Sequence, residues 1–242
     1  MQVDSRKGPP SKIAPPHAEK IDFDDYSANY DELLHESTKL FAEDSEYFAK
    51  YKVQLAAKHA ARSPIKRVLE YGCGTGRNIR HLQAAFPDAE VVGTDISAES
   101  LRLARANNPN AEFKLESPSL ELGRFDLVFI ACVFHHIPLA EREGVMKSLA
   151  TRLAPGGSIY VFEHNPFNPV TRKLVNDCPF DADAILLKPE ELRGLFRHAG
   201  IRLNEVSYCL FVPPRLSWFI RLEKYLRWLP MGGQYWIRGT GT

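Results

Sequence analysis

The sequence predicts an α/β protein with a doubly wound, mostly parallel sheet, and two observations support this prediction. After Pro64, short apolar runs alternate with segments whose apolar residues recur every three to four positions, as strands alternate with helices in this class. The runs are apolar enough to be buried on both faces, which is typical of parallel strands covered by helices on each side. A chain of 242 residues, 44% of them hydrophobic, can bury such a core as one domain with additions.

Two segments are expected to precede the core. Residues 1–20 combine Pro, Lys and Ser with almost no large apolar side chains, so we expect a disordered tail. Residues 21–63 carry aromatic and leucine side chains at helical spacing and predict an N-terminal helical cap. Residues 64–242 are expected to form the core itself.

The strands and helices of the core can be taken in chain order. Five apolar runs predict strands: RVLEYG, EVVGTDI, AEFKLE, FDLVFIACV and SIYVFE. The stretches GRNIRHLQAAF and AESLRLARANN lie between them and have helical spacing. Further along, KPEELRGLFRHAG predicts a capped amphipathic helix that ends at Gly200. The final GGQYWIRG predicts an edge strand that closes the sheet.

Three glycines follow the first predicted strand at alternate positions. Gly72, Gly74 and Gly76 predict a turn that takes positive φ and lets a ligand approach the backbone with no Cβ in the way. A dinucleotide fingerprint needs G-x-G-x-x-G, but Arg77 stands where its third glycine would be. Glu70 would repel a pyrophosphate and suits a cation, such as an α-amino group.

An acidic side chain ends the second predicted strand. Asp95 lies 23 residues after Gly72 and is well placed to accept hydrogen bonds from both hydroxyls of a ribose. Together with Glu70, it predicts a ligand that has both a ribose and an amine.

In four blocks the sequence resembles the class I S-adenosylmethionine-dependent methyltransferases, in their small-molecule branch. The blocks are LEYGCGTG, GTDIS, FDLVFIACVFHHIP and LAPGGSIYVFE, and their order and spacing match over roughly residues 26–209. The resemblance implies a Rossmann-like methyltransferase fold with a seven-stranded sheet. It implies S-adenosyl-L-methionine as cofactor, S-adenosyl-L-homocysteine as product, and a small-molecule acceptor, with no metal needed.

The resemblance also assigns parts of the cofactor to residues. It implies that Glu70 and the backbone around Gly72, Cys73 and Gly74 hold the methionine part. Asp95 would hold the ribose. An alternative interpretation of the glycines is a tight turn with no ligand.

Five further residues are expected beside the cofactor. Ile96 would pack on the adenine, and Ala131 would pass the methionine part by its backbone. Tyr30 resembles an aromatic residue that lines the cofactor in related enzymes. Where the family commonly has an acidic residue near the adenine amine, this chain reads FKLESPS, so Glu116 and Ser117 are rival candidates.

Two histidines follow the fourth predicted strand. His135 and His136 lie at its carboxyl end, where open α/β sheets place their sites, and a histidine titrates in the right range for a general base. Glu163 ends the fifth strand and could orient that base or bind a polar acceptor group. The alternatives are a loop histidine bonded to backbone for at least one of the pair, and a polar turn around Glu163.

Two flanking segments are expected to select the acceptor or a partner surface. An insertion over residues 166–187 would cover the substrate, as such insertions do in this fold. Residues 213–230 carry an apolar stripe with Arg and Lys around it. This amphipathic segment predicts either packing against its own domain or a second subunit, or peripheral contact with a membrane or lipid-like acceptor.

Composition limits the classes of partner that the sequence predicts. Lys and Arg total 31 against 30 Asp and Glu, so there is no general electrostatic reason to expect nucleic acid. No apolar run approaches the roughly 20 residues of a membrane helix, and no signal peptide is recognisable. The four cysteines are far apart, which suggests neither a zinc site nor a disulfide framework. We therefore expect a cytoplasmic protein without a transmembrane segment, of open oligomeric state.

The expected function is methyl transfer from S-adenosylmethionine to an oxygen, nitrogen or carbon atom of a small molecule, such as a natural product, a sugar or a lipid-linked intermediate. Direct displacement, with a histidine as general base, is the expected mechanism. Two alternatives are a non-catalytic module that binds the cofactor and a nicotinamide-dependent oxidoreductase. The oxidoreductase should show the wider glycine spacing, which is absent here.

Overall fold

The computed structural model describes residues 24, 46–60, 64–212, 218 and 221–241, apart from the side chain of Phe180. The expected tail over residues 1–20 and Tyr30 lie outside the described residues, as does most of the expected helical cap over residues 21–63.

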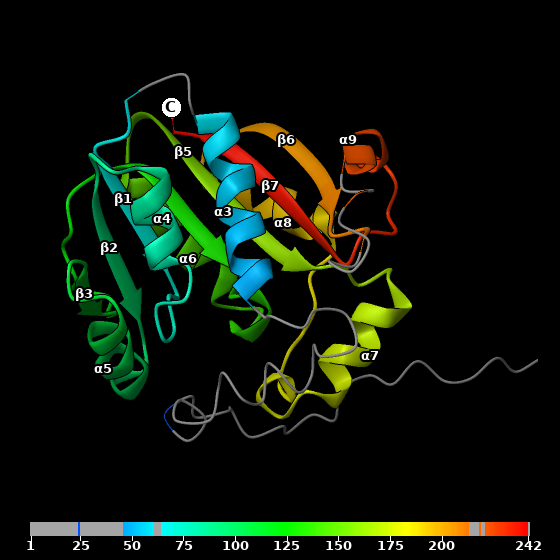
Figure 1. Ribbon diagram of the computed structural model, residues 1–242, viewed down its shortest axis with the longest axis horizontal. Coiled ribbons are helices and arrows are strands. Elements are labelled where there is room, and N and C mark those ends of the chain that lie inside the picture. Colours follow the sequence, from blue (N-terminus) through cyan, green and yellow to red (C-terminus); the bar gives the residue numbers. More distant parts are fainter. Residues whose placement is uncertain (1–23, 25–45, 61–63, 213–217, 219–220, 242) are drawn as a thin grey trace, which may run out of the picture.

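A seven-stranded sheet confirms the predicted α/β fold class (Figure 1). Its strands are β1 Arg67–Tyr71, β2 Glu90–Asp95, β3 Glu112–Leu115, β4 Phe125–Ala131, β5 Leu153–His164, β6 Arg202–Cys209 and β7 Gln234–Thr240. Their order in the sheet is β3-β2-β1-β4-β5-β7-β6. The pairs among β1 to β5 are parallel, whereas β7 runs antiparallel to both β5 and β6.

Helices cover both faces of this sheet. The described helices are α3 Glu46–Ala60, α4 Ile79–Ala85, α5 Ala98–Asn107, α6 Arg142–Thr151, α7 Pro169–Asp177, α8 Pro189–His198 and α9 Glu223–Leu226, with the 3-10 helices η2 Phe134–His136 and η3 Pro179–Asp181. In Figure 1, α3 and α4 lie in front of the sheet and α6 and α8 lie behind it. The predicted capped helix is confirmed as α8, where the Glu191 carboxylate accepts a hydrogen bond from the Lys188 N–H.

Alternate residues of each central strand pack into two separate hydrophobic cores, one on each face of the sheet. Both faces of these strands are therefore apolar. In β4, Phe129 packs with the α3 and α4 side of the sheet, whereas Val128 packs with the α6 and α8 side. In β5, Phe162 and Val161 divide in the same way. All four side chains are fully buried, as expected for a sheet covered on both faces.

The last strand corrects one prediction from the sequence. GGQYWIRG is not an edge strand, because β7 lies between β5 and β6. Its consecutive residues Tyr235, Trp236 and Ile237 are all fully buried, so both faces of the strand are covered as well as both of its backbone edges. The edge strand on this side of the sheet is β6, whose first three residues are exposed.

The sheet order reverses between β1 and β4, which are neighbours in the sheet although β2 and β3 separate them in the chain. In open α/β sheets a ligand crevice lies outside the carboxyl ends of the strands at such a point. Figure 1 shows α7, part of the expected insertion over residues 166–187, below this end of the sheet.

The described part of the C-terminal amphipathic segment exposes large side chains. Trp218, Tyr225 and Trp228 are between 65% and 76% exposed, while Glu223 is buried. Residues 213–217 and 219–220 lie outside the described residues, and the role of the segment stays a prediction. Among the residues that the structure describes, no helix combines the length and apolar character needed to cross a membrane.

Candidate active site

A cavity of about 550 Å³ lies at the carboxyl ends of the strands around the switch point. The glycine loop after β1 and the end of β2 form one part of its wall, and the segment after β4 forms another. Residues of α3, of α7 and of the chain after β6 line further sides. The volume lies within the range of roughly 300–1,000 Å³ that is typical of small-molecule sites.

The glycine loop has the backbone that its sequence predicts. Gly72, Gly74 and Gly76 take φ values of 68°, 52° and 81°. A Cβ at Gly72 would lie 2.5 Å from the side chain of Val133, and one at Gly76 would lie 2.6 Å from Asn108. At Gly74, which lines the cavity, a Cβ would meet nothing within 4 Å. The space beside Gly74, the middle glycine, is therefore open for a ligand and is not filled by packing of the protein.

Asp95 joins the end of β2 to the glycine loop. One carboxylate oxygen accepts a hydrogen bond from the Gly74 N–H at 2.7 Å, and the other accepts from the Ser97 N–H at 2.9 Å. Burial raises the pKa of Asp95, although these backbone N–H groups partly offset the effect. Beside it, Ile96 lines the cavity with a side chain that is 58% exposed, which leaves an apolar surface suited to a flat ring.

Glu70 directly precedes Tyr71, which lines the cavity, and the side chain of Glu70 is buried. One oxygen accepts a hydrogen bond from Asn78 Nδ2 at 2.6 Å, but the other has no partner among the described residues. Burial raises the pKa of Glu70 to about 8, although Asn78 and Lys52 act against this shift. A buried carboxyl group with one unsatisfied oxygen favours a nearby cation.

These features fit the cofactor expected from the sequence. The open space at Gly74 admits a ligand to the backbone, Glu70 supplies a carboxyl group for an amine, and Asp95 and Ile96 suit a nucleoside.

The two candidates for the adenine contact lie in different surroundings. Glu116 lines the cavity, and its two oxygens accept hydrogen bonds from the guanidinium of Arg152 at 2.6 and 2.9 Å. Ser117 Oγ lies 3.4 Å from Ser119 Oγ, and the residue is not among the described residues that line the cavity.

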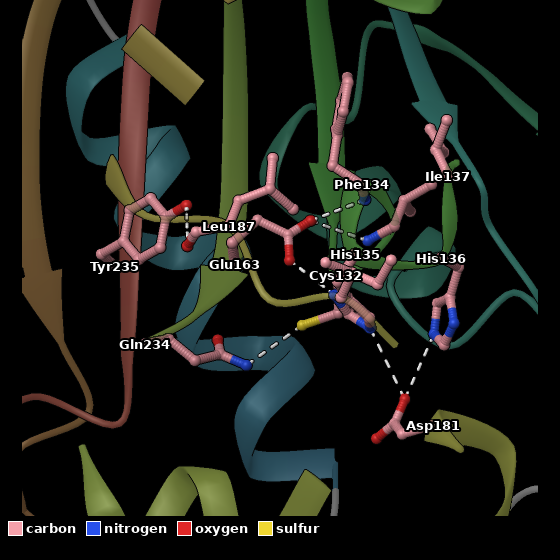
Figure 2. A network of polar contacts seen from close by, with 12 residues as sticks. Cys132, Phe134, His135, His136, Ile137, Glu163, Asp181, Leu187, Gln234 and Tyr235 are labelled. Atoms are coloured by element: carbon pink, nitrogen blue, oxygen red, sulfur yellow. Dashed lines mark hydrogen bonds and ion pairs between the residues drawn. The ribbon is translucent and has the colours of Figure 1, made fainter. Parts of the chain in front are cut away.

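Glu163 and His135 form a buried pair at the ends of β5 and β4 (Figure 2). One carboxylate oxygen of Glu163 accepts from the backbone N–H groups of Val133 and Phe134, at 3.1 and 2.8 Å. The other lies 2.6 Å from His135 Nδ1. Burial lowers the pKa of His135, but Glu163 and Asp181 outweigh it and raise the pKa to about 10. Glu163 therefore fixes the position of η2 and the orientation of the His135 ring.

His136 and His135 both point toward Asp181, which lies on η3 (Figure 2). Asp181 Oδ1 lies 3.2 Å from His136 Nε2 and 3.6 Å from His135 Nε2. The Nδ1 atom of His136 lies 3.3 Å from an oxygen of Asp183. Neither aspartate is identifiable from the local sequence, because only the fold brings the insertion after β5 to the histidines.

The surroundings of Cys132 were likewise not predictable from the sequence. It follows β4 directly and takes φ 60°, which is uncommon for a residue other than glycine. Its Sγ lies 3.2 Å from Gln234 Nε2 and 4.0 Å from Lys52 Nζ. Burial raises the pKa of its thiol, but Lys52 and His164 outweigh it and bring the pKa to about 7. Ala131 and Cys132 both line the cavity between the glycine loop and the histidines.

Comparison with known proteins agrees with this geometry. Residues 69–159 match the family described as "Methyltransferase domain". The chain is 34% identical over 199 residues to a trans-aconitate 2-methyltransferase of Variovorax paradoxus, covering 75% of this chain and 71% of that protein. It is 29% identical over 211 residues to the Azoarcus protein of the same name, covering 82% of this chain and 79% of that one.

A solved structure shows the same fold. The crystal structure of a SAM dependent methyltransferase from Archaeoglobus fulgidus matches with a TM-score of 0.63 at 17% identity, over 84% of this chain and 97% of that one. The sequence relationship to the methyltransferases favours the S-adenosylmethionine interpretation of the glycine loop over the nicotinamide interpretation. The chain belongs to the class I S-adenosylmethionine-dependent methyltransferases and is an enzyme of that family.

Proposed function

We propose that this enzyme transfers the methyl group of S-adenosylmethionine to an oxygen, nitrogen or carbon atom of a small molecule held in the cavity, and that a hydroxyl oxygen is the acceptor best supported. The observation that carries this proposal is the pair of histidines that lines the cavity directly after β4, with Glu163 behind it. A hydroxyl group must lose its proton when it is methylated, and an imidazole near the acceptor can take that proton.

The donor side follows from the geometry of the glycine loop. Glu70 and the backbone of Gly72, Cys73 and Gly74 would hold the methionine part, and Asp95 would hold the ribose. Ile96 supports this placement, since its exposed side chain offers a surface for the adenine. The backbone of Ala131 would pass beside the methionine part. For the adenine amine we favour Glu116 over Ser117, because Glu116 lines the cavity.

The reaction is a displacement at the methyl carbon. A lone pair of the acceptor oxygen forms the new C–O bond, while the C–S bond breaks and its electron pair stays on sulfur, giving S-adenosylhomocysteine. The hydroxyl proton passes to the imidazole. The enzyme contributes mainly by holding donor and acceptor in line, which converts an encounter in solution into a reaction within one complex.

Of the two histidines, His136 is the better proton acceptor. The pKa of His135 is raised to about 10, so its ring already carries a proton at neutral pH. Glu163 lies 2.6 Å from the Nδ1 atom of His135 and is not among the described residues that line the cavity. We therefore assign the base to His136, and to Glu163 and His135 the positioning of η2.

The acceptor part of the cavity is largely apolar. Its walls include aliphatic side chains of α7, the side chains after β6 and one buried lysine: Val170, Leu174, Val175, Phe211, Val212 and Lys52. This lining fits a compact apolar or aromatic acceptor that carries one anionic group for Lys52. Two relatives act on trans-aconitate by name, so that carboxylate belongs in the first set of acceptors tested.

The test measures release of S-adenosylhomocysteine with a panel of phenols, phenolic acids and trans-aconitate. We expect turnover with a hydroxyl-bearing acceptor, and a loss of at least 100-fold in kcat for His136→Asn, since general base catalysis typically contributes about 10²–10⁴-fold. The matched control is His198→Asn, which changes an exposed histidine that pairs with Glu143 outside the cavity. Unchanged kcat in His136→Asn would contradict the assignment of the base.

A further inference from the structure

Three potential metal ligands converge on one point of the cavity wall. His135, His136 and Asp181 each offer one ligand atom, and these three atoms lie within 4.8 Å of one another. Asp181 Oδ1 faces the Nε2 atoms of both rings. The two imidazole rings are neighbours on η2, with ring centroids 4.1 Å apart, and Asp181 approaches them from η3 (Figure 2). All three residues line the cavity.

The other nitrogen of each ring faces a carboxylate. His135 Nδ1 lies 2.6 Å from Glu163, and His136 Nδ1 lies 3.3 Å from Asp183. Ionised carboxylates only accept hydrogen bonds, so each of these contacts places a proton on Nδ1. A histidine whose Nδ1–H is held by a carboxylate presents its Nε2 lone pair outward, which is the usual second-shell arrangement at metal sites.

The three convergent atoms therefore repel one another unless something positive lies between them. When both rings are neutral, their Nε2 lone pairs face the oxygen of Asp181, which is itself an acceptor, whereas a protonated His135 ring donates its Nε2–H toward that oxygen. Negative charge nearby also favours a cation at this point, because three carboxylates, those of Glu163, Asp181 and Asp183, contact the two imidazole rings. Either additional protons or one cation must lie at the point of convergence.

We propose that His135, His136 and Asp181 bind one divalent transition-metal ion at this point. Metal bonds of 2.0–2.1 Å in a tetrahedral site separate neighbouring ligand atoms by about 3.3–3.4 Å. The distances from Asp181 Oδ1 to the two Nε2 atoms, 3.2 and 3.6 Å, lie on either side of this value. The longer of the two exceeds the length of a hydrogen bond, so protons alone account less well for the geometry.

The donor set selects the class of ion. Two imidazoles and one carboxylate suit Zn²⁺, Fe²⁺, Co²⁺ or Ni²⁺, whereas Mg²⁺ prefers an all-oxygen octahedral shell. Three protein ligands leave a fourth position open, as in catalytic zinc sites. Because the three ligands line the cavity, that position is accessible to an oxygen atom of a bound small molecule.

This site changes the reaction in one respect, and that consequence rests on the proposed function. A metal ion takes the lone pair with which His136 would accept a proton, so the two roles exclude each other. A bound ion would lower the pKa of an acceptor hydroxyl at its open position, so that the hydroxyl proton would pass to water and not to His136. The acceptor oxygen would then form the C–O bond at the methyl carbon, while the electron pair of the C–S bond stays on sulfur. A metal at this site differs from the expectation, drawn from the sequence, that the enzyme needs no metal.

The test is titration of chelator-treated, full-length protein with Zn²⁺ and, separately, with Co²⁺. We expect one Zn²⁺ per chain by calorimetry and, with Co²⁺, the intense visible absorption of a tetrahedral site. Asp181→Asn should weaken Zn²⁺ binding by more than about 100-fold, and the outer-shell change Asp183→Asn by about 10–100-fold. His198→Asn is the matched control, because it removes an exposed histidine that also pairs with a carboxylate, and should leave binding unchanged.

Three outcomes would overturn the metal site: no saturable Zn²⁺ binding by the folded wild type, Zn²⁺ affinity unchanged in both aspartate variants, or equal weakening in His198→Asn. If Asp181→Asn fails to fold, Asp183→Asn and the Co²⁺ spectrum of the wild type decide. Each sample is also titrated with S-adenosylmethionine. Cofactor binding without Zn²⁺ binding would refute the metal site alone, whereas Zn²⁺ binding without cofactor binding would refute the proposed function.

Discussion

The substitution Gly74→Ala tests whether the glycine loop holds the cofactor or is only a tight turn. At φ 52° an alanine is strained, and a left-handed conformation costs about 1–2 kcal/mol. The added methyl group meets no protein atom within 4 Å, so the protein should lose little else. It does enter the space assigned to the cofactor, where overpacking typically costs about 1–3 kcal/mol. At about 1.4 kcal/mol per tenfold change, S-adenosylmethionine should bind roughly 5- to 150-fold more weakly.

Gly156 provides the matched control for this experiment. It has φ 73°, and a Cβ there would also meet nothing within 4 Å, but it lies in the first half of β5 and does not line the cavity. Gly156→Ala should therefore lower the free energy of unfolding by a similar amount and leave the affinity for S-adenosylmethionine unchanged. Denaturant unfolding and calorimetric titration of both variants make the comparison. Equal cofactor affinity in Gly74→Ala and Gly156→Ala would refute the assignment of the loop.

Three further predictions follow from the same site. The pKa of Glu70 is raised from 4.5 to about 8 in the folded state, so the ligand-free protein should lose stability as pH rises from 5 to 8. Glu70→Gln should remove about 3 kcal/mol of that loss, measured by denaturant unfolding at the two pH values. Asp95→Asn should weaken S-adenosylmethionine roughly 10- to 100-fold in calorimetry, because hydrogen bonds to a charged group contribute about 1.5–3 kcal/mol; affinity equal to that of the wild type would rule out the ribose contact. Cys132 should react with iodoacetamide with a midpoint near pH 7, and Lys52→Met should move the midpoint to higher pH, since the lysine stabilises the thiolate; a midpoint that stays in place would show that Lys52 has no such effect.

The parts of the fold that were predictable depend on local sequence. Gly72, Gly74 and Gly76 all take positive φ, as their alternation after a strand indicated, because glycine alone adopts that backbone without strain. The apolar runs identified strands buried on both faces, since apolar side chains fill most positions on either face of such a strand. In contrast, Arg202–Cys209 forms β6 although it contains no apolar run, because an edge strand needs little burial.

The parts of the site that were not predictable depend on contacts between distant segments. Asp181 and Asp183 belong to the insertion after β5, and nothing in their local sequence relates them to His135 and His136. The positive φ of Cys132 has no local signal either, because a residue other than glycine disfavours this backbone. The prediction that GGQYWIRG lies at the edge of the sheet was wrong for a related reason. Whether a terminal strand lies at the edge depends on where another strand pairs with it.

The central claim is that the loop after β1 and the end of β2 bind S-adenosylmethionine. Its most direct test is calorimetric titration of the purified wild-type chain with S-adenosylmethionine and, in a separate experiment, with NADH. We expect saturable binding of one S-adenosylmethionine per chain and no saturable binding of NADH. Saturable binding of NADH, or no binding of S-adenosylmethionine by a sample shown to be folded, would contradict it.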